Sequence, residues 1–133
     1  MDTAQIISAL SNVGLSATAQ RIAVFQVVHN EADHPTPEQV KAAVDKVFPK
    51  ISLATVYNTL NALVERGLVN AVKVPDSGKV VYDANVSKHY HFIDEDSGRL
   101  IDLSPELVQV NMNLPEAFQV NDVDVFIKGR RNT

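Results

Sequence analysis

Three histidines and two aspartates are the residues of this sequence whose types and spacing could bind a metal. His89 and His91 are two apart in a stretch of alternating character, so in a β-strand both imidazoles project from one face. Asp102 lies in the next alternating stretch, which we expect to pair with the first as a hairpin. Asp83 ends an earlier apolar stretch, and His34 lies in a loop before a proline. Imidazoles with carboxylates suit Fe(II), Mn(II) or Zn(II), so we predict one metal site with these five ligands.

Two other interpretations of these residues are open. A pair of histidines can simply lie on a solvated strand face, but here the candidate ligands come from both halves of the chain and flank the junction. An ion bound there would lock the orientation of the two halves. A His/Asp site with an open position can also activate water, so a metal-dependent hydrolase is the alternative from a different class. Since no further general base and no glycine-rich loop accompany the pair, we predict no catalytic residues and no enzyme.

The stretch Ser52–Gly67 predicts an amphipathic helix. Ser52 is a good N-cap, and Gly67 suits the left-handed position after the last turn. One stripe of this helix is apolar and is predicted to be buried, at Val56, Leu60, Leu63 and Val64. The opposite face carries uncharged hydrogen-bonding side chains where a recognition helix meets base edges, namely Thr55, Asn58, Thr59 and Asn61, with Tyr57 on the flank.

Two predicted strands after this helix complete a winged-helix pattern. Residues 68–74 and 79–83 are joined by Pro-Asp-Ser-Gly, a hairpin turn composition. An ordinary amphipathic helix packed on a hairpin is the alternative. Arg21, in the first turns of an earlier helix, is either a phosphate contact or a solvated surface arginine. On the winged-helix interpretation the partner is double-stranded DNA, bound by Arg21, Ser52, Thr55, Tyr57 and Asn58.

The remaining elements predict an α+β fold with two domains. Before residue 84 we expect helices over Asp2–Val13, Ala19–Asn30 and from Thr36 to about Phe48, with a loop over residues 31–35. After it we expect the hairpin His89–Ile93 and Arg99–Leu103, a short helix from Ser104 to about Asn113, and a strand over Phe118–Lys128. The domains are then a winged helix-turn-helix DNA-binding domain at residues 1–84 and a small α/β dimerisation and metal-sensing domain at 85–133. So small a second domain can hardly bury a core alone, which predicts a homodimer.

The composition limits the function classes. The 133 residues include no cysteine, which excludes disulfides, thiolate catalysis and cysteine-ligated zinc. No apolar run approaches a membrane span and no signal peptide is visible, so we expect no membrane partner and a cytoplasmic location. Residues 1–84 carry seven Lys and Arg against eight Asp and Glu, and residues 85–133 carry five against eight. The DNA-binding half is near neutral, so we expect conditional DNA binding.

Four strings resemble the ferric uptake regulator (Fur) family over essentially the whole chain: GLSATAQRIAVF, HPTPEQV, ISLATVYNTLNALVERGLV and VYDANVSKHYHFIDEDSGRLIDL. Family members are homodimeric winged-helix repressors whose regulatory metal bridges the DNA-binding and dimerisation domains. The resemblance implies a metal-dependent repressor with Fe(II) or Mn(II) at His34, Asp83, His89, His91 and Asp102. Zn(II) is expected to substitute in vitro.

Within the family, different parts of the sequence resemble two different branches. Asp102, where other members carry glutamate, resembles the peroxide-sensing regulators, in which His34 and His89 would be the oxidised ligands. The strings SLATVYNTL and VDVFIKGRR resemble the iron response regulators of alphaproteobacteria, which answer to haem or iron status. We expect a sensor of peroxide or iron, with an iron-status regulator as the alternative and haem as its cofactor.

Two positions depart from the family pattern. Members with a structural zinc have CxxC after the histidine pair, and here those positions hold Asp94 and Ser97, so no structural zinc is expected. Dimer stability must then come from apolar packing. Many members also place a Lys or Arg at the position of Ser16, where a cation can enter the minor groove. That contact is not carried over to this chain.

Overall fold

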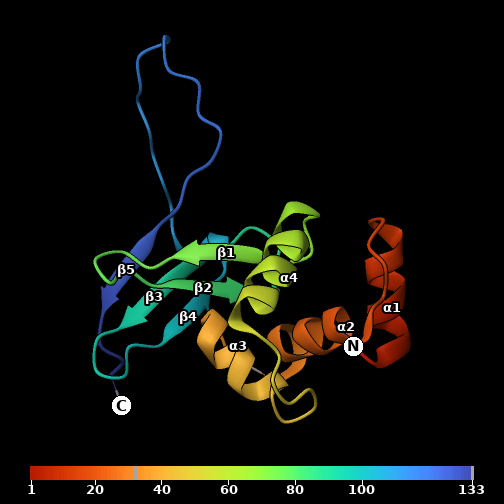
Figure 1. Cartoon of the computed structure of the whole chain (residues 1–133). Coiled ribbons are helices and arrows are strands. Elements are labelled where there is room, and N and C mark those ends of the chain that lie inside the picture. The colour runs from red at the N-terminus through yellow and green to blue at the C-terminus, as the bar shows by residue number, and fades with distance from the viewer. Residues whose placement is uncertain (32, 133) are drawn as a thin grey trace. The chain divides into compact units, whose positions relative to one another are not determined.

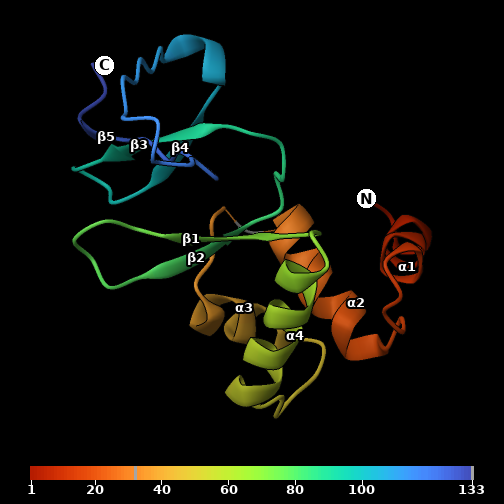
Figure 2. The same cartoon turned by 90° about the horizontal axis from the view of Figure 1, so that it is seen from above.

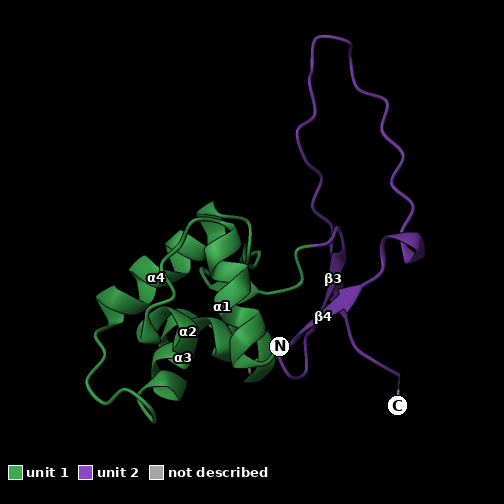
Figure 3. Ribbon diagram, turned by 90° about the vertical axis from the view of Figure 1, so that its right-hand side faces the viewer, with its two compact units in different colours: residues 1–86 green, residues 87–133 purple. Residues whose placement is uncertain are grey.

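The computed structural model describes residues 1–31 and 33–132 and divides the chain into two compact units. Unit 1 is Met1–Val86 and unit 2 is Ser87–Thr133 (Figure 3). Unit 1 combines α-helices with a two-stranded hairpin, and unit 2 is built on a three-stranded sheet. This mixture confirms the α+β fold class. Among the described residues, none of the helices is long and apolar enough to cross a bilayer.

Four α-helices form most of unit 1: α1 (Thr3–Asn12), α2 (Ala19–Gln26), α3 (Pro37–Val44) and α4 (Leu53–Glu65) (Figures 1 and 2). Each begins where a short polar side chain accepts a backbone N–H of the first turn, and these caps are Asp2, Thr18, Thr36 and Ser52. The predicted helices therefore start within one residue of their observed positions. α2 contacts α1, α3 and α4, so it lies at the centre of the unit.

The second helix changes its hydrogen-bond register before it ends. After Gln26 it continues as a π-helix, η1 (Val27–Glu31), whose first two residues are buried. The prediction of a helix over Ala19–Asn30 is thus confirmed as a helix, but only its first part is an α-helix. The predicted loop at residues 31–35 includes Ala32, which lies outside the described residues.

One hydrophobic core fills unit 1. Its buried side chains come from all four helices and from the hairpin, and the largest are Phe25, Ile6, Leu10, Leu60 and Leu63. The third helix ends at Val44 rather than near Phe48, so that part of the prediction is wrong. Residues 45–47 continue as turns, and the N–H of Phe48 donates to the carbonyl of Val44 at 2.8 Å before Pro49 ends the segment.

The wing is the hairpin of β1 (Asn70–Lys73) and β2 (Val80–Asp83), which pair antiparallel with Asn70 opposite Asp83. The backbone N–H of Tyr82 on β2 donates to the carbonyl of Pro35 at 2.9 Å. This bond joins the wing to the loop that follows η1. Helices followed by this hairpin make unit 1 a winged helix-turn-helix, as predicted.

The sheet of unit 2 has the order β4-β3-β5. The strands β3 (Tyr90–Asp94) and β4 (Leu100–Leu103) pair antiparallel, with His91 opposite Asp102. The strand β5 (Phe126–Gly129) runs parallel to β3, with Phe126 opposite His91. The predicted hairpin is therefore present.

Two predictions in unit 2 are wrong. The segment after Ser104 forms only a single turn of 3₁₀-helix, η2 (Pro105–Leu107), because Ser104 makes no side-chain cap bond and Leu107 is 70% exposed. The strand expected over Phe118–Lys128 is confined to β5. Between η2 and β5 the chain extends away from the sheet of unit 2 and then returns to it (Figure 3), and the carbonyl of Val125 accepts the N–H of His91 at 3.1 Å just before β5 begins. A strand needs a paired backbone, so this segment has no regular structure within one chain.

Candidate metal half-sites and recognition helix

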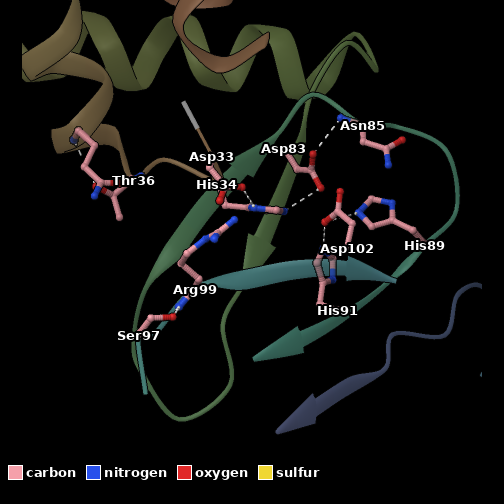
Figure 4. Close-up of polar contacts among 11 residues, drawn as sticks. Asp33, His34, Thr36, Asp83, Asn85, His89, His91, Ser97, Arg99 and Asp102 are labelled. Atoms are coloured by element: carbon pink, nitrogen blue, oxygen red, sulfur yellow. Dashed lines mark hydrogen bonds and ion pairs between the residues drawn. The ribbon is translucent and has the colours of Figure 1, made fainter. Parts of the chain in front are cut away.

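In unit 1, His34 and Asp83 face each other. The Nε2 atom of His34 lies 3.3 Å from Oδ2 of Asp83 (Figure 4). His34 adopts a left-handed backbone conformation, with φ of 47°, which is uncommon for a residue other than glycine. Asp83 ends β2, and its Oδ1 accepts the backbone N–H of Asn85 at 2.9 Å. An imidazole and a carboxylate placed in this way form two of the five predicted metal ligands.

In unit 2, two histidines converge on one carboxylate oxygen. The Nε2 atoms of His89 and His91 lie 3.4 and 3.5 Å from Oδ1 of Asp102 (Figure 4). The strand register brings this about, because His91 and Asp102 are direct partners on β3 and β4. The ring of His91 also stacks on Phe126 of β5, with centroids 5.4 Å apart. Three predicted ligands therefore meet on one sheet.

The backbone and a neighbouring carboxylate orient the histidine rings. Nδ1 of His89 donates to the carbonyl of Ser87 at 2.7 Å, and Nδ1 of His34 donates to Oδ1 of Asp33 at 2.8 Å. In a neutral imidazole a proton on Nδ1 leaves a lone pair on Nε2, the nitrogen that binds a metal. Neither Asp33 nor Ser87 was predicted to have this role. Asp33 directly precedes His34 and Ser87 lies two residues before His89, and this proximity in sequence was the available signal.

The N-terminal half of α4 presents polar side chains to solvent. Tyr57 is 39% exposed, and Asn58 is exposed beside it. Ser52 caps the helix, accepting the N–H of Thr55 at 3.0 Å, and the two hydroxyl oxygens are 2.8 Å apart. Four of the five predicted DNA-binding residues therefore lie in or next to the first half of one helix.

One residue predicted for the polar face of α4 is buried. Thr59 is only 7% exposed, because it follows Val56 by three residues and precedes Leu63 by four, and so joins the apolar stripe. The fifth predicted DNA-binding residue, Arg21, lies in the first turn of α2. Its guanidinium donates to the carbonyl of Ser16 at 3.0 Å, which holds the cation at the loop before the helix.

A hydrogen bond that could not be predicted from the sequence connects α4 with α3. The hydroxyl of Tyr57 donates to Oε1 of Glu38, on the first turn of α3, at 3.5 Å. Tyr82 of β2 is buried, and burial raises the pKa of its hydroxyl. The charges of Tyr57 and Glu38 raise that pKa further.

The positions at which the family resemblance implies CxxC in members with a structural zinc hold a direct hydrogen bond in this chain. Oγ of Ser97 donates to Oδ2 of Asp94 at 2.9 Å, and the N–H of Asp96 donates to Oδ1 of Asp94 at 3.0 Å. The bond from Ser97 is the main reason that the pKa of Asp94 lies below its ordinary value. Two arginines after β5 add ion pairs, with Arg131 at 3.8 Å from Asp94 and Arg130 at 3.3 Å from Asp96.

Comparisons with known proteins agree with the fold and the residue pattern. The family model described as ferric uptake regulator family matches residues 12–128. The peroxide-responsive repressor PerR of Staphylococcus epidermidis is 34% identical over 120 residues, which cover 90% of this chain and 77% of that protein.

Two solved structures are similar over nearly the whole chain. The ferric uptake regulator of Pseudomonas aeruginosa, solved with manganese, is 25% identical with a TM-score of 0.70, covering 96% of this chain and 98% of that one. The Campylobacter jejuni peroxide stress regulator is also 25% identical, with a TM-score of 0.64 and coverage of 100% and 98%. The resemblance drawn from the sequence is thereby confirmed, and the chain belongs to the ferric uptake regulator family, whose members are transcriptional regulators rather than enzymes.

Proposed function

We propose that this protein is a homodimeric repressor that binds operator DNA when one Fe(II) or Mn(II) ion is held by His34, Asp83, His89, His91 and Asp102. The observation that carries the proposal is the convergence of His89 and His91 on one oxygen of Asp102. An Fe(II) or Mn(II) ion takes up to six ligands, so the three donors of His89, His91 and Asp102 alone would leave it incompletely coordinated. His34 and Asp83 offer two more donors of the same kind.

The donor set fits such an ion. All five side chains offer imidazole nitrogen or carboxylate oxygen, the ligands that Fe(II) and Mn(II) accept, and the chain has no thiolate that would favour Zn(II) or Cu(I). Asp33 and Ser87 hold the Nδ1 protons of His34 and His89, so both rings present Nε2. The similar Pseudomonas protein was solved with manganese, which supports this choice.

Because the five ligands come from both units, one shared ion restricts the motion of unit 1 relative to unit 2. In a homodimer that restriction sets the spacing of the two recognition helices. DNA half-sites lie at fixed separations along the duplex, so the spacing decides whether both helices can bind together. Metal binding is thereby linked to operator affinity.

Within unit 1, we assign base contacts to Tyr57 and Asn58 on the exposed face of α4. The Ser52 and Thr55 hydroxyls at the N-terminus of this helix, together with Arg21, contact phosphate oxygens. A helix N-terminus and a guanidinium both favour an anion. Since the unit is near neutral, these few contacts give weak binding that needs the dimer.

The experiment that tests this function is a DNA-binding measurement on the full chain with and without Mn(II). A duplex selected from a random pool by the Mn(II)-loaded protein serves as the operator. Tyr57→Ala with Asn58→Ala should abolish binding to this duplex while Mn(II) affinity and the dimer persist. His91→Ala should lose both Mn(II) and DNA. Asn12→Ala, which removes an exposed amide at the end of α1, is the matched control. If no duplex is enriched, or if a folded Tyr57/Asn58 variant still binds it, the proposal fails.

The signal that we propose is peroxide. The identity to the Staphylococcus repressor supports this choice, as does the likeness to the Campylobacter peroxide stress regulator. An iron ion held by these ligands would supply the chemistry that activates the peroxide O–O bond, which Mn(II) does not readily do. Overall, one peroxide molecule reacts with His34 or His89: the imidazole carbon between the two nitrogens loses its C–H bond and gains one oxygen atom, the ring gives up two electrons, and the peroxide accepts them to leave one water, so the oxidation state of the iron is unchanged at the end. The 2-oxo-histidine that results is a poor ligand, so the metal and then the DNA are released.

Peptide mass spectrometry distinguishes this signal from its alternative. After peroxide treatment, the peptides with His34 or His89 should each gain one oxygen in the Fe(II) protein and remain unchanged in the Mn(II) protein. His29, exposed on η1, is the internal control because it belongs to neither half-site. Equal oxidation with both metals would contradict peroxide sensing. Loss of DNA on addition of haem, without histidine oxidation, would favour an iron-status regulator.

A further inference from the structure

The recognition helix has an exposed tyrosine that is tied to a neighbouring helix. The hydroxyl of Tyr57 donates to the Glu38 carboxylate at 3.5 Å, although the two residues are 19 apart in sequence. Glu38 is held in place by its own helix start. Pro37 occupies the first position of α3, and Thr36 and Gln39 form a capping box on either side of Glu38. The acceptor therefore sits on a rigid backbone rather than on a mobile loop.

A carboxylate at this position should weaken DNA binding. Glu38 is exposed and within hydrogen-bond distance of a residue that is expected to meet DNA, so it repels the phosphate backbone. Unit 1 has few cations with which to offset that repulsion. The position of this acid is explained if Glu38 favours DNA binding through Tyr57 by more than its repulsion of phosphate weakens that binding.

We propose that Glu38 is a positioning residue for operator recognition, which acts by fixing the Tyr57 side chain in the orientation that reads the DNA. This inference rests on the proposed function, in that Tyr57 must contact the operator. An exposed tyrosine that rotates freely must be ordered when it binds, and the bond to Glu38 orders it beforehand. The gain is specific to the duplex that Tyr57 recognises. Repulsion between Glu38 and phosphate, by contrast, acts equally on all DNA.

The test is a double-mutant cycle on the full-length, Mn(II)-loaded protein. The variants are Glu38→Ala, Tyr57→Phe and the combination of both. Affinities are measured for the duplex selected by the wild-type protein and for a scrambled duplex of the same composition. Glu38→Ala and Tyr57→Phe should each weaken binding to the selected duplex roughly three- to tenfold. The double variant should be no weaker than either single variant, because both changes remove the same bond. Affinity for the scrambled duplex should stay the same in Tyr57→Phe, and it should stay the same or rise in the two variants that lack Glu38, because they lose the repulsion of phosphate.

Two further variants separate positioning from charge. Glu38→Gln keeps an oxygen that accepts the tyrosine hydroxyl, so it should retain most of the wild-type affinity for the selected duplex. Glu65→Ala removes an equal charge from an exposed position at the other end of α4, and it should not distinguish the two duplexes. Tighter binding of both duplexes by Glu38→Ala and Glu38→Gln alike would mean that Glu38 acts only by repulsion. Additive losses in the double variant would also overturn the proposal.

A measurement without DNA keeps this inference distinct from the proposed function. The NMR order of the Tyr57 ring in the free protein should fall in Glu38→Ala and stay at the wild-type level in Glu65→Ala. If the ring loses order but Tyr57→Ala leaves operator affinity unchanged, the contact between α3 and α4 stands and the recognition role of Tyr57 falls. If the ring is equally ordered in both variants, Glu38 does not position Tyr57.

Discussion

Units 1 and 2 bury very different amounts of apolar side chain. Among the described residues, the buried apolar side chains lie between Ile6 and Tyr82, with the single exception of Leu100 on β4. Unit 2 instead leaves its large apolar side chains exposed between η2 and β5, at Leu107, Val110, Met112, Leu114, Phe118 and Val120. Unit 1 is stabilised by its own core. Unit 2 must obtain stability from polar bonds within the sheet and from surfaces outside one chain.

Polar side chains add to the stability of both units. In unit 1 they cap the starts of the helices, where each cap satisfies a backbone group, and some join distant segments, as Arg66 does with the carbonyl of Val13. In unit 2, which has little buried apolar surface, polar pairs such as Lys88 with Asp122 and Arg130 with Asp96 join segments that are distant along the chain. Such exposed ion pairs are weak one by one. Four predictions exploit this contrast, from the largest expected effect to the smallest.

The largest effect is expected from a cavity in the core of unit 1. Phe25 on α2 is 1% exposed, so Phe25→Ala should lower the free energy of unfolding by roughly 3–5 kcal/mol. Phe118→Ala removes the same ring from a side chain that is 65% exposed, and it should change the unfolding of unit 1 by less than about 0.5 kcal/mol. Thermal denaturation followed by circular dichroism measures both. Equal losses would mean that the two units are stabilised in the same way.

The second prediction concerns the exposed apolar segment of unit 2. If a second copy covers it, Phe118→Asp should raise the dimer dissociation constant at least about tenfold, because an ionised carboxylate would be buried without a partner. Asn113→Asp adds the same charge to a nearby exposed polar residue and should change it little. Sedimentation measures both. A chelator should strip the regulatory metal and leave the wild-type dimer, since apolar packing needs no ion. Monomers on chelation would place the metal in the dimer interface.

The contrast between the units also explains what the sequence could predict. The four helices of unit 1 were predicted because the signals are local: a cap at Thr18 or Ser52, an apolar stripe and a terminating glycine lie within a few turns. The convergence of His89, His91 and Asp102 was predicted because the two histidines share a strand face and Asp102 lies on the next strand. Both arguments need only short-range periodicity.

The failures have the opposite cause. The helix expected after Ser104 and the long strand expected over Phe118–Lys128 both required a packing partner that one chain does not offer, so the apolar pattern alone was misleading. The parallel pairing of β5 with β3 depends on a connection of many residues, which no local pattern specifies. The bond between Tyr57 and Glu38 likewise joins two helices, and its geometry follows from how α3 packs on α4.

The third prediction tests the polar bond that replaces CxxC. The bond from Ser97 lowers the pKa of Asp94, so its contribution to the stability of unit 2 is full above the ordinary aspartate pKa of about 3.9 and is lost as the pH falls through the lower folded value. Ser97→Ala should raise the pKa of Asp94 and speed amide exchange at the β3–β4 turn at neutral pH. The difference from wild type should shrink once the pH falls below the folded pKa.

Amide exchange followed by NMR measures this effect in each unit separately. Ser104→Ala is the control, because Ser104 makes no side-chain cap bond at η2. Exchange in the helices of unit 1 should be the same in all three proteins. Faster exchange in unit 1 as well would show that the turn stabilises the whole chain, and an unchanged Asp94 pKa in Ser97→Ala would contradict the assigned role of the hydroxyl.

The smallest effect is expected where the extended segment returns to the sheet of unit 2. The ammonium of Lys88 donates to Asp122 at 2.9 Å and also to the carbonyl of Val123. The bond from Lys88 to Asp122 is the main reason that the pKa of Asp122 lies below its ordinary value. Both side chains are largely exposed, so solvent screens the pair. Lys88→Met should let the pKa of Asp122 rise towards the ordinary value while the melting temperature stays the same.

Below that pKa the protonated Asp122 no longer attracts Lys88, so wild type and variant should exchange amides around Val123 equally in acid. At neutral pH the variant should exchange faster there, and Lys73→Met, on the wing of unit 1, should not. An Asp122 titration by NMR that is identical in wild type and Lys88→Met would show that this ion pair does not fix the segment, and that unit 2 relies on apolar packing alone.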